Sequence, residues 1–178
     1  STIHFEAHYN YRNRLDALRE EFAPFKLKMK IGIETFDAEF RENVLHKGIP
    51  ETDPAEICRG FQEGNFLFGV AGQTQESMER DIKLGLAHLE RICLNVMTEN
   101  TTSIKPDAQV IRVFVENIMP RYQDNQRVDI LLNNTDFGVG DQLIMNALLL
   151  LFSVIFIFGA ALLAYRLFGK AGLFVVSA

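Results

Sequence analysis

The chain has 178 residues, with 18 Lys and Arg against 23 Asp and Glu, and a net charge of −5. All of its acidic residues lie in residues 1–141, and no stretch concentrates Lys and Arg. Because phosphate contacts require clustered basic side chains, this composition argues against a nucleic-acid-binding protein. Residues 143–165 contain no charged side chain, which argues against a simple soluble globule.

Residues 1–132 alternate predicted strands and helices. Residues 2–8 are extended in composition, and a helix over 14–22 is indicated by apolar residues three or four positions apart, with Pro24 ending it. Residues 27–33 alternate apolar and polar side chains, which predicts a strand. The same criteria predict helices over 37–46, 53–61, 74–89 and 107–119, and strands over 65–71, 92–97 and 128–132.

This alternation indicates parallel strands joined by crossover helices, so the predicted fold class is α/β. In β/α barrels, chemistry gathers where the carboxyl ends of the strands form one open rim. Polar side chains and glycines follow the predicted strands at these ends. They are Glu6, His8, Asn10, Glu34, Thr35, Gly69, Gly72, Gln73, Asn95, Glu99, Asn133 and Asp136.

Two motifs resemble radical S-adenosylmethionine (SAM) enzymes. Residues 31–37, Ile-Gly-Ile-Glu-Thr-Phe-Asp, with 40–43 and 47–48 following, are similar to the fourth strand and next helix of that family. Residues 68–77 are similar to its next strand-to-helix turn, with Ala71 where Pro is usual. The resemblance covers residues 1–140 and implies the C-terminal part of a partial (β/α) barrel that uses SAM and a [4Fe-4S] cluster.

The resemblance also implies a SAM site. Glu34 would accept from the ribose hydroxyls or the methionine ammonium, although a carboxylate favoured by the helix dipole is the alternative. Arg41 would clamp a carboxylate, or simply pair with Asp37 one helical turn away. The expected cofactor residues are Glu34, Thr35, Arg41, Gly69, Gly72 and Gln73, of which the two glycines are equally explained by turn geometry.

The expected substrate site begins on the first strand. Glu6, His8 and Asn10 alternate along the chain, so all three would face one side and suit the edge of a heterocycle. A solvated edge strand would have the same pattern. Asn95 and Asp136, at the ends of later strands, complete the expected substrate group, and no proton donor or acceptor is assigned.

The two cysteines, Cys58 and Cys93, are predicted to be small buried hydrophobes. A Cys-x3-Cys-x2-Cys loop, which binds the cluster in radical SAM enzymes, does not occur in this sequence. We therefore expect the cluster ligands to lie outside the sequence, no metal ligand within it, and no activity from it alone. The sequence opens without Met and closes in an apolar tract, and we expect it to be a fragment.

Residues 141–178 are predicted to be a second module, with 143–165 crossing a membrane. Residues 164–170, Ala-Tyr-Arg-Leu-Phe-Gly-Lys, resemble the first membrane helix of a vitamin-uptake family that includes queuosine-precursor transporters. An unrelated membrane anchor is the alternative.

The two resemblances together imply a fusion for queuosine salvage. A radical SAM lyase acting on queuine, a 7-deazapurine base, would be joined to a queuosine-precursor transporter, with the catalytic part in the cytoplasm and attached to the cell membrane. Two alternatives remain open. One is a transporter whose N-terminal domain is degenerate, and the other is a membrane-anchored radical enzyme with a different substrate.

Overall fold

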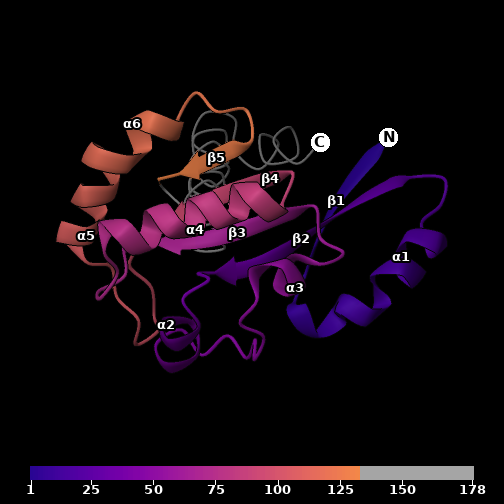
Figure 1. Ribbon diagram of the computed structural model, residues 1–178, viewed down its shortest axis with the longest axis horizontal. Coiled ribbons are helices and arrows are strands. Elements are labelled where there is room, and N and C mark those ends of the chain that lie inside the picture. The colour runs from indigo at the N-terminus through magenta and orange to yellow at the C-terminus, as the bar shows by residue number, and fades with distance from the viewer. Residues whose placement is uncertain (133–178) are drawn as a thin grey trace, which may run out of the picture. The chain divides into compact units, whose positions relative to one another are not determined.

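The computed structural model describes residues 1–132, which contain one five-stranded parallel sheet (Figure 1). Each strand pairs with the next strand in the sequence, in the order β1-β2-β3-β4-β5. The strands are β1 (Thr2–Ala7), β2 (Lys26–Glu34), β3 (Glu63–Phe68), β4 (Arg91–Val96) and β5 (Val128–Leu131). The predicted α/β class with parallel strands is confirmed.

The helices begin where side chains can accept hydrogen bonds from the first free backbone N–H groups. Asp37, Asp53, Thr74 and Asp107 cap four of them in this way. The helices are α1 (Leu15–Glu21), α2 (Ala38–Asn43), α3 (Pro54–Cys58), α4 (Gln75–His88), α5 (Ala108–Val113) and α6 (Met119–Tyr122), with a 3₁₀ helix, η1 (Tyr9–Arg14), and a π-helical turn, η2 (Phe114–Ile118).

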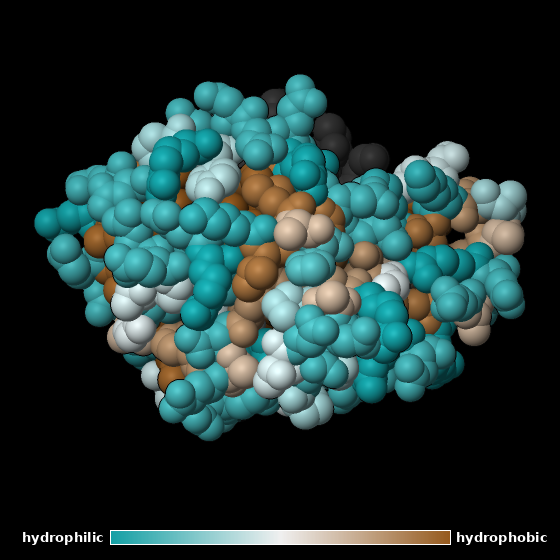
Figure 2. Space-filling view, viewed as in Figure 1, coloured by the Kyte–Doolittle hydropathy of each residue, from teal (hydrophilic) through white to brown (hydrophobic). Residues whose placement is uncertain are grey.

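One face of the sheet forms the hydrophobic core. Successive side chains of a strand point to opposite faces, and the core-facing residues are fully or almost fully buried. They are Met29, Ile31, Ile33, Phe66, Phe68, Ile92, Leu94 and Val96. Helices α1, α3 and α4 lie on this side of the sheet (Figure 1). Figure 2 shows their outer surface, which is largely hydrophilic with a narrow hydrophobic strip near the centre.

The other face of the sheet is polar. The pairing register places His4 and Glu6 of β1 beside Lys28 and Lys30 of β2, and aligns Asn65 of β3 with Cys93 of β4. No helix within residues 1–132 covers this face. Parallel sheets are normally covered on both faces, so an uncovered face lined with charged and amide side chains calls for a functional explanation. We refer to it below as the open face.

The strand order has a further consequence. Right-handed crossovers between strands that follow one another in sequence order place every helix on the same side of the sheet. Doubly wound sheets reverse their order and carry helices on both faces, whereas β/α barrels keep one order and one helical side. Residues 1–132 have the second arrangement.

Some predicted boundaries were wrong. The chain leaves β1 at Ala7 and enters η1, and the helix predicted over 37–46 ends at Asn43. The strand predicted to reach residue 71 ends at Phe68, because Gly69 adopts a φ of 93°. No helix among residues 1–132 is long and apolar enough to span a membrane. The predicted span 143–165, the module 141–178 and Asp136 lie outside the described residues.

Candidate functional site

The carboxyl end of β2 is distorted where the SAM motif was expected. The register against β3 shifts between Gly32 and Glu34, so β2 carries one extra residue there. Glu34 has a φ of 67°, a left-handed conformation that costs a non-glycine residue about 1–2 kcal/mol. Bulges of this kind at the rim of a sheet redirect a side chain. The carboxylate of Glu34 accepts a hydrogen bond from Nζ of Lys47 at 2.8 Å.

Gly32, one step before the bulge, leaves room for three charged groups above the open face. A Cβ at Gly32 would lie 3.4 Å from Oε1 of Glu6, 3.4 Å from Nζ of Lys47 and 3.5 Å from Oε1 of Glu34. Across the same gap, Nδ2 of Asn65 donates to Oε2 of Glu6 at 2.8 Å. Two of the predicted residues, Glu6 and Glu34, are therefore brought together, and Lys47 and Asn65 join them.

The predicted alternation of Glu6, His8 and Asn10 is wrong beyond Ala7. His8 caps η1, since its Nδ1 accepts from the backbone N–H of Asn10, and Asn10 lies in that helix with an exposed side chain. Nε2 of His8 is 2.9 Å from the carbonyl oxygen of Lys47 and so anchors the segment that carries Lys47. The structure thus gives His8 a supporting position and moves Asn10 away from the strand.

Asn95 lies two residues after Cys93 in β4 and therefore on the same, open face. Its Oδ1 is 3.7 Å from the Cys93 sulfur. It shares this face with Asn65, because Asn65 is aligned with Cys93. The open face therefore carries Glu6, Asn65 and Asn95 on three strands.

Thr35 points away from the open face. It is buried, and its hydroxyl donates to Oδ2 of Asp81 at 2.7 Å, while Oδ1 of Asp81 accepts from the backbone N–H of Phe36 at 2.9 Å. Asp81 belongs to α4, so this carboxyl group ties the helix to the turn after Glu34. Burial raises the pKa of Asp81 to about 6, against the opposing effect of these two hydrogen bonds.

This raised pKa predicts a pH-dependent stability. An unfolded aspartate has a pKa of about 4, so the folded state holds the proton more tightly between about pH 4 and about pH 6. The stabilisation from Asp81 is complete below that range and is lost as the pH rises through it. The free energy of unfolding of the wild type, minus that of Asp81→Asn, should fall by about 2–3 kcal/mol from pH 4 to pH 6.5. Urea denaturation of both proteins at each pH measures this difference, and a difference that does not change with pH would contradict the raised pKa of Asp81.

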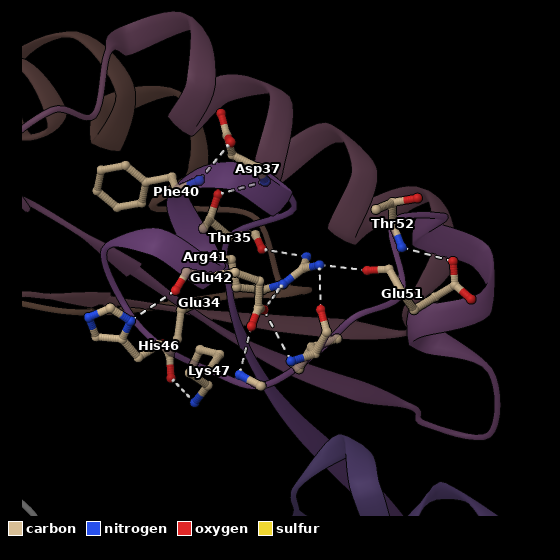
Figure 3. A network of polar contacts seen from close by, with 12 residues as sticks. Glu34, Thr35, Asp37, Phe40, Arg41, Glu42, His46, Lys47, Glu51 and Thr52 are labelled. Carbon is tan, nitrogen blue, oxygen red and sulfur yellow. Dashed lines mark hydrogen bonds and ion pairs between the residues drawn. The ribbon is translucent and has the colours of Figure 1, made fainter.

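The guanidinium of Arg41 is occupied by groups of the chain itself, which disfavours its predicted role as a carboxylate clamp. Its side chain is fully buried, and its guanidinium donates to the carbonyl oxygens of Thr35, Ile49 and Glu51 and pairs with Glu42 at 3.2 Å (Figure 3). The alternative pairing with Asp37 is wrong, because Asp37 pairs with Arg80. Arg41 instead organises the loop between α2 and α3.

The turn after β3 contains Gly69, Gly72 and Gln73, and the last two of these line a separate cavity. Gln73 is buried and closes the turn, accepting from the N–H of Val70 and donating to the carbonyl of Leu67. A Cβ at Gly69 would lie 2.6 Å from Ile111. The cavity, about 360 Å³, lies between this turn and α2 and is lined by Thr35, Asp37, Phe40, Gly72, Gln73, Thr74, Glu76, Ser77 and Arg80. The polar groups of Thr74, Ser77 and Asp37 are already used in helix caps. This favours the interpretation that Gly69 and Gly72 serve the geometry of the turn and not a ligand.

The thiols do not fit an iron–sulfur cluster. Cys58 and Cys93 are free and buried, as predicted, and burial raises the pKa of Cys58 to about 12 and that of Cys93 above its usual value. Cluster binding requires several thiolates. Among residues 1–132, no three His, Cys, Asp or Glu side chains gather closely enough to hold a metal ion.

Sequence reasoning missed Lys47 and Asn65. Lys47 lies in a loop that has no hydrophobic periodicity. Apart from its place in the motif, at residues 47–48, nothing in the sequence indicates that it contacts Glu34. The apolar run after Asn65 predicts a buried strand that begins at this residue. An amide within such a run is itself unusual, because burying an unpaired polar group costs free energy.

The sequence matches no family model and no curated protein. A solved structure does match, with a TM-score of 0.72 and 37% sequence identity: the queuine lyase from Clostridium spiroforme bound to SAM and queuine. The match covers 79% of this chain and 60% of the lyase chain. This chain is therefore similar in both sequence and fold to a queuine lyase and spans about three-fifths of that enzyme.

Proposed function

We propose that residues 1–132 form part of the barrel of a radical SAM lyase that acts on queuine. The observation that carries this proposal is the 37% identical structure, which binds both SAM and queuine. The open face supports it independently, because the one-sided helical cover and the strand order are those of a barrel segment whose polar face would be the lumen.

The residues around Gly32 fit the amino-acid part of SAM. This part of the molecule is a zwitterion, and Glu34 and Lys47 form a pair of opposite charges, each about one-quarter exposed or less. On binding, the ammonium group would replace Lys47 at Glu34, while Lys47 would turn to the carboxylate of the ligand. The strained backbone of Glu34 agrees with this role, since such strain gathers at ligand sites.

The same face supplies the substrate side. Glu6 is exposed and lies next to Gly32, so a base could rest against β1 and β3 while SAM occupies the end of β2. Asn95 would border the base from β4. Thr35 and Arg41 would hold the turn that follows Glu34, and Gln73 would hold the turn after β3, without touching a ligand.

SAM, when bound, supplies the means of removing a hydrogen atom from an unactivated carbon. The chain's own residues bind and orient: Glu34 and Lys47 fix the amino-acid head, and Glu6 fixes the base. The two cysteines do not contribute to a cluster in this proposal. Residues 141–178 remain, in this proposal, the start of a queuosine-precursor transporter that attaches the cytoplasmic part to the membrane. A simple anchor remains the alternative.

Isothermal titration calorimetry on the full chain tests the proposal. We expect SAM and queuine each to bind with a stoichiometry of one, and saturation with SAM to leave queuine binding in place, because the two occupy neighbouring parts of the open face. Lys28→Gln, at the far end of the same face, should bind both ligands unchanged. Absence of binding for both ligands would contradict the proposal.

A further inference from the structure

Glu6 and Asn65 form a pair that is unusual on a strand surface. They lie on β1 and β3, two strands apart, and meet only because Gly32 on the strand between them has no side chain. The hydrogen bond from Nδ2 of Asn65 to Oε2 of Glu6 fixes the orientation of the amide. The reverse orientation would place two oxygen acceptors at 2.8 Å and is therefore excluded.

This orientation leaves two acceptors without donors. Oδ1 of Asn65 is buried and has no hydrogen-bond partner among the described residues. Within the same part of the chain, the structure gives Oε1 of Glu6 no donor either, although this atom lies 3.4 Å from the Cβ position of Gly32. A buried acceptor without a partner is costly, so this pair is suited to a ligand that presents two donors side by side.

We infer that Glu6 and Asn65 recognise the pyrimidinone edge of a guanine-type base; this rests on the proposed function. The ring N1–H and the exocyclic 2-amino group are adjacent donors. One would donate to the carboxylate of Glu6 and the other to Oδ1 of Asn65. Charge-assisted bonds of this type are stronger than neutral ones, so Glu6 contributes more of the affinity.

The pair also excludes adenine-type bases. The corresponding edge of 7-deazaadenine presents a ring nitrogen acceptor beside an amino donor, so in either orientation the ring nitrogen would face an acceptor, the carboxylate of Glu6 or Oδ1 of Asn65. A site built to receive donors rejects a ligand that lacks them, because its own groups are left unpaired. Glu6 and Asn65 therefore determine which class of 7-deazapurine binds.

Calorimetry on the full chain tests the inference with queuine, 7-deazaguanine, 7-deazaadenine and SAM. We expect Glu6→Gln and Asn65→Leu each to weaken queuine binding by about 10- to 100-fold. Glu6→Gln should also reduce the preference for 7-deazaguanine over 7-deazaadenine, because an amide offers a donor and an acceptor. SAM affinity should remain within about twofold of the wild type, which shows that the variants fold. Lys28→Gln is the matched control on the same face.

The outcomes separate the two claims. If the wild type binds neither SAM nor queuine, the proposed function fails. If the wild type binds both, but Glu6→Gln and Asn65→Leu keep the affinity for queuine and the preference between the two bases, the inference fails and the proposed function stands.

Discussion

Replacing Arg41 with methionine is expected to lower the free energy of unfolding by about 3–5 kcal/mol, because it leaves buried groups without their partner. The guanidinium is fully buried and serves the carbonyl oxygens of Thr35, Ile49 and Glu51. It also pairs with Glu42, whose carboxylate accepts from the N–H groups of Gly48 and Ile49. Loss of Arg41 would therefore release the whole loop between α2 and α3. Urea denaturation measures the change.

Arg80→Met is the matched control. Arg80 also pairs with a carboxylate, that of Asp37, but the two side chains are 51% and 37% exposed. Exposed pairs contribute about 0–1 kcal/mol, so this variant should be nearly as stable as the wild type. If Arg41→Met were as stable as the wild type but bound SAM more weakly, Arg41 would be the carboxylate clamp that the sequence motif suggested.

Replacing Glu34 with glutamine is expected to weaken SAM binding by about 10- to 100-fold, because a hydrogen-bonded charge pair with the ligand ammonium is lost. The fold should tolerate the change, since the pair with Lys47 is partly exposed. Lys47→Met should weaken SAM binding as well, by removing the partner of the ligand carboxylate. Calorimetric titration of each variant measures these affinities.

A ligand without the amino-acid part separates the two possible roles of Glu34. 5′-Methylthioadenosine keeps the ribose hydroxyls of SAM but has neither ammonium nor carboxylate, so Glu34→Gln should bind it as the wild type does. Equal weakening of both ligands would assign Glu34 to the ribose. Glu76→Gln, which alters the separate cavity beside α4, should change neither affinity. A weaker affinity of Glu76→Gln for either ligand would instead place the cofactor site in that cavity.

The parallel sheet could be predicted because hydrophobic periodicity reports which face of an element is buried. The alternation at Leu27, Met29, Ile31 and Ile33 correctly identifies the core face of β2. What periodicity does not report is how a strand ends. The bulge before Glu34 and the turn at Gly69 depend on local backbone conformation. The bulge was therefore not predicted, and the strand predicted to reach residue 71 ends at Phe68.

The candidate site could be predicted only where side chains follow a regular strand. Glu6 and Asn95 lie on the open face because β1 and β4 remain extended at those positions. Asn10 was misplaced because η1 begins at Tyr9. The contacts of Arg41 could not be predicted because its partners are backbone carbonyls of a later loop, which no sequence motif specifies. Lys47 and Asn65 reach the site through contacts across strands and loops.

A crystal structure of the full chain with SAM and queuine would show directly whether the open face is the ligand site. We expect the base to lie against Glu6 and Asn65, and the amino-acid part of SAM to lie at Glu34 and Lys47. Ligands bound instead in the cavity beside Arg80, with the open face left to solvent, would contradict this expectation.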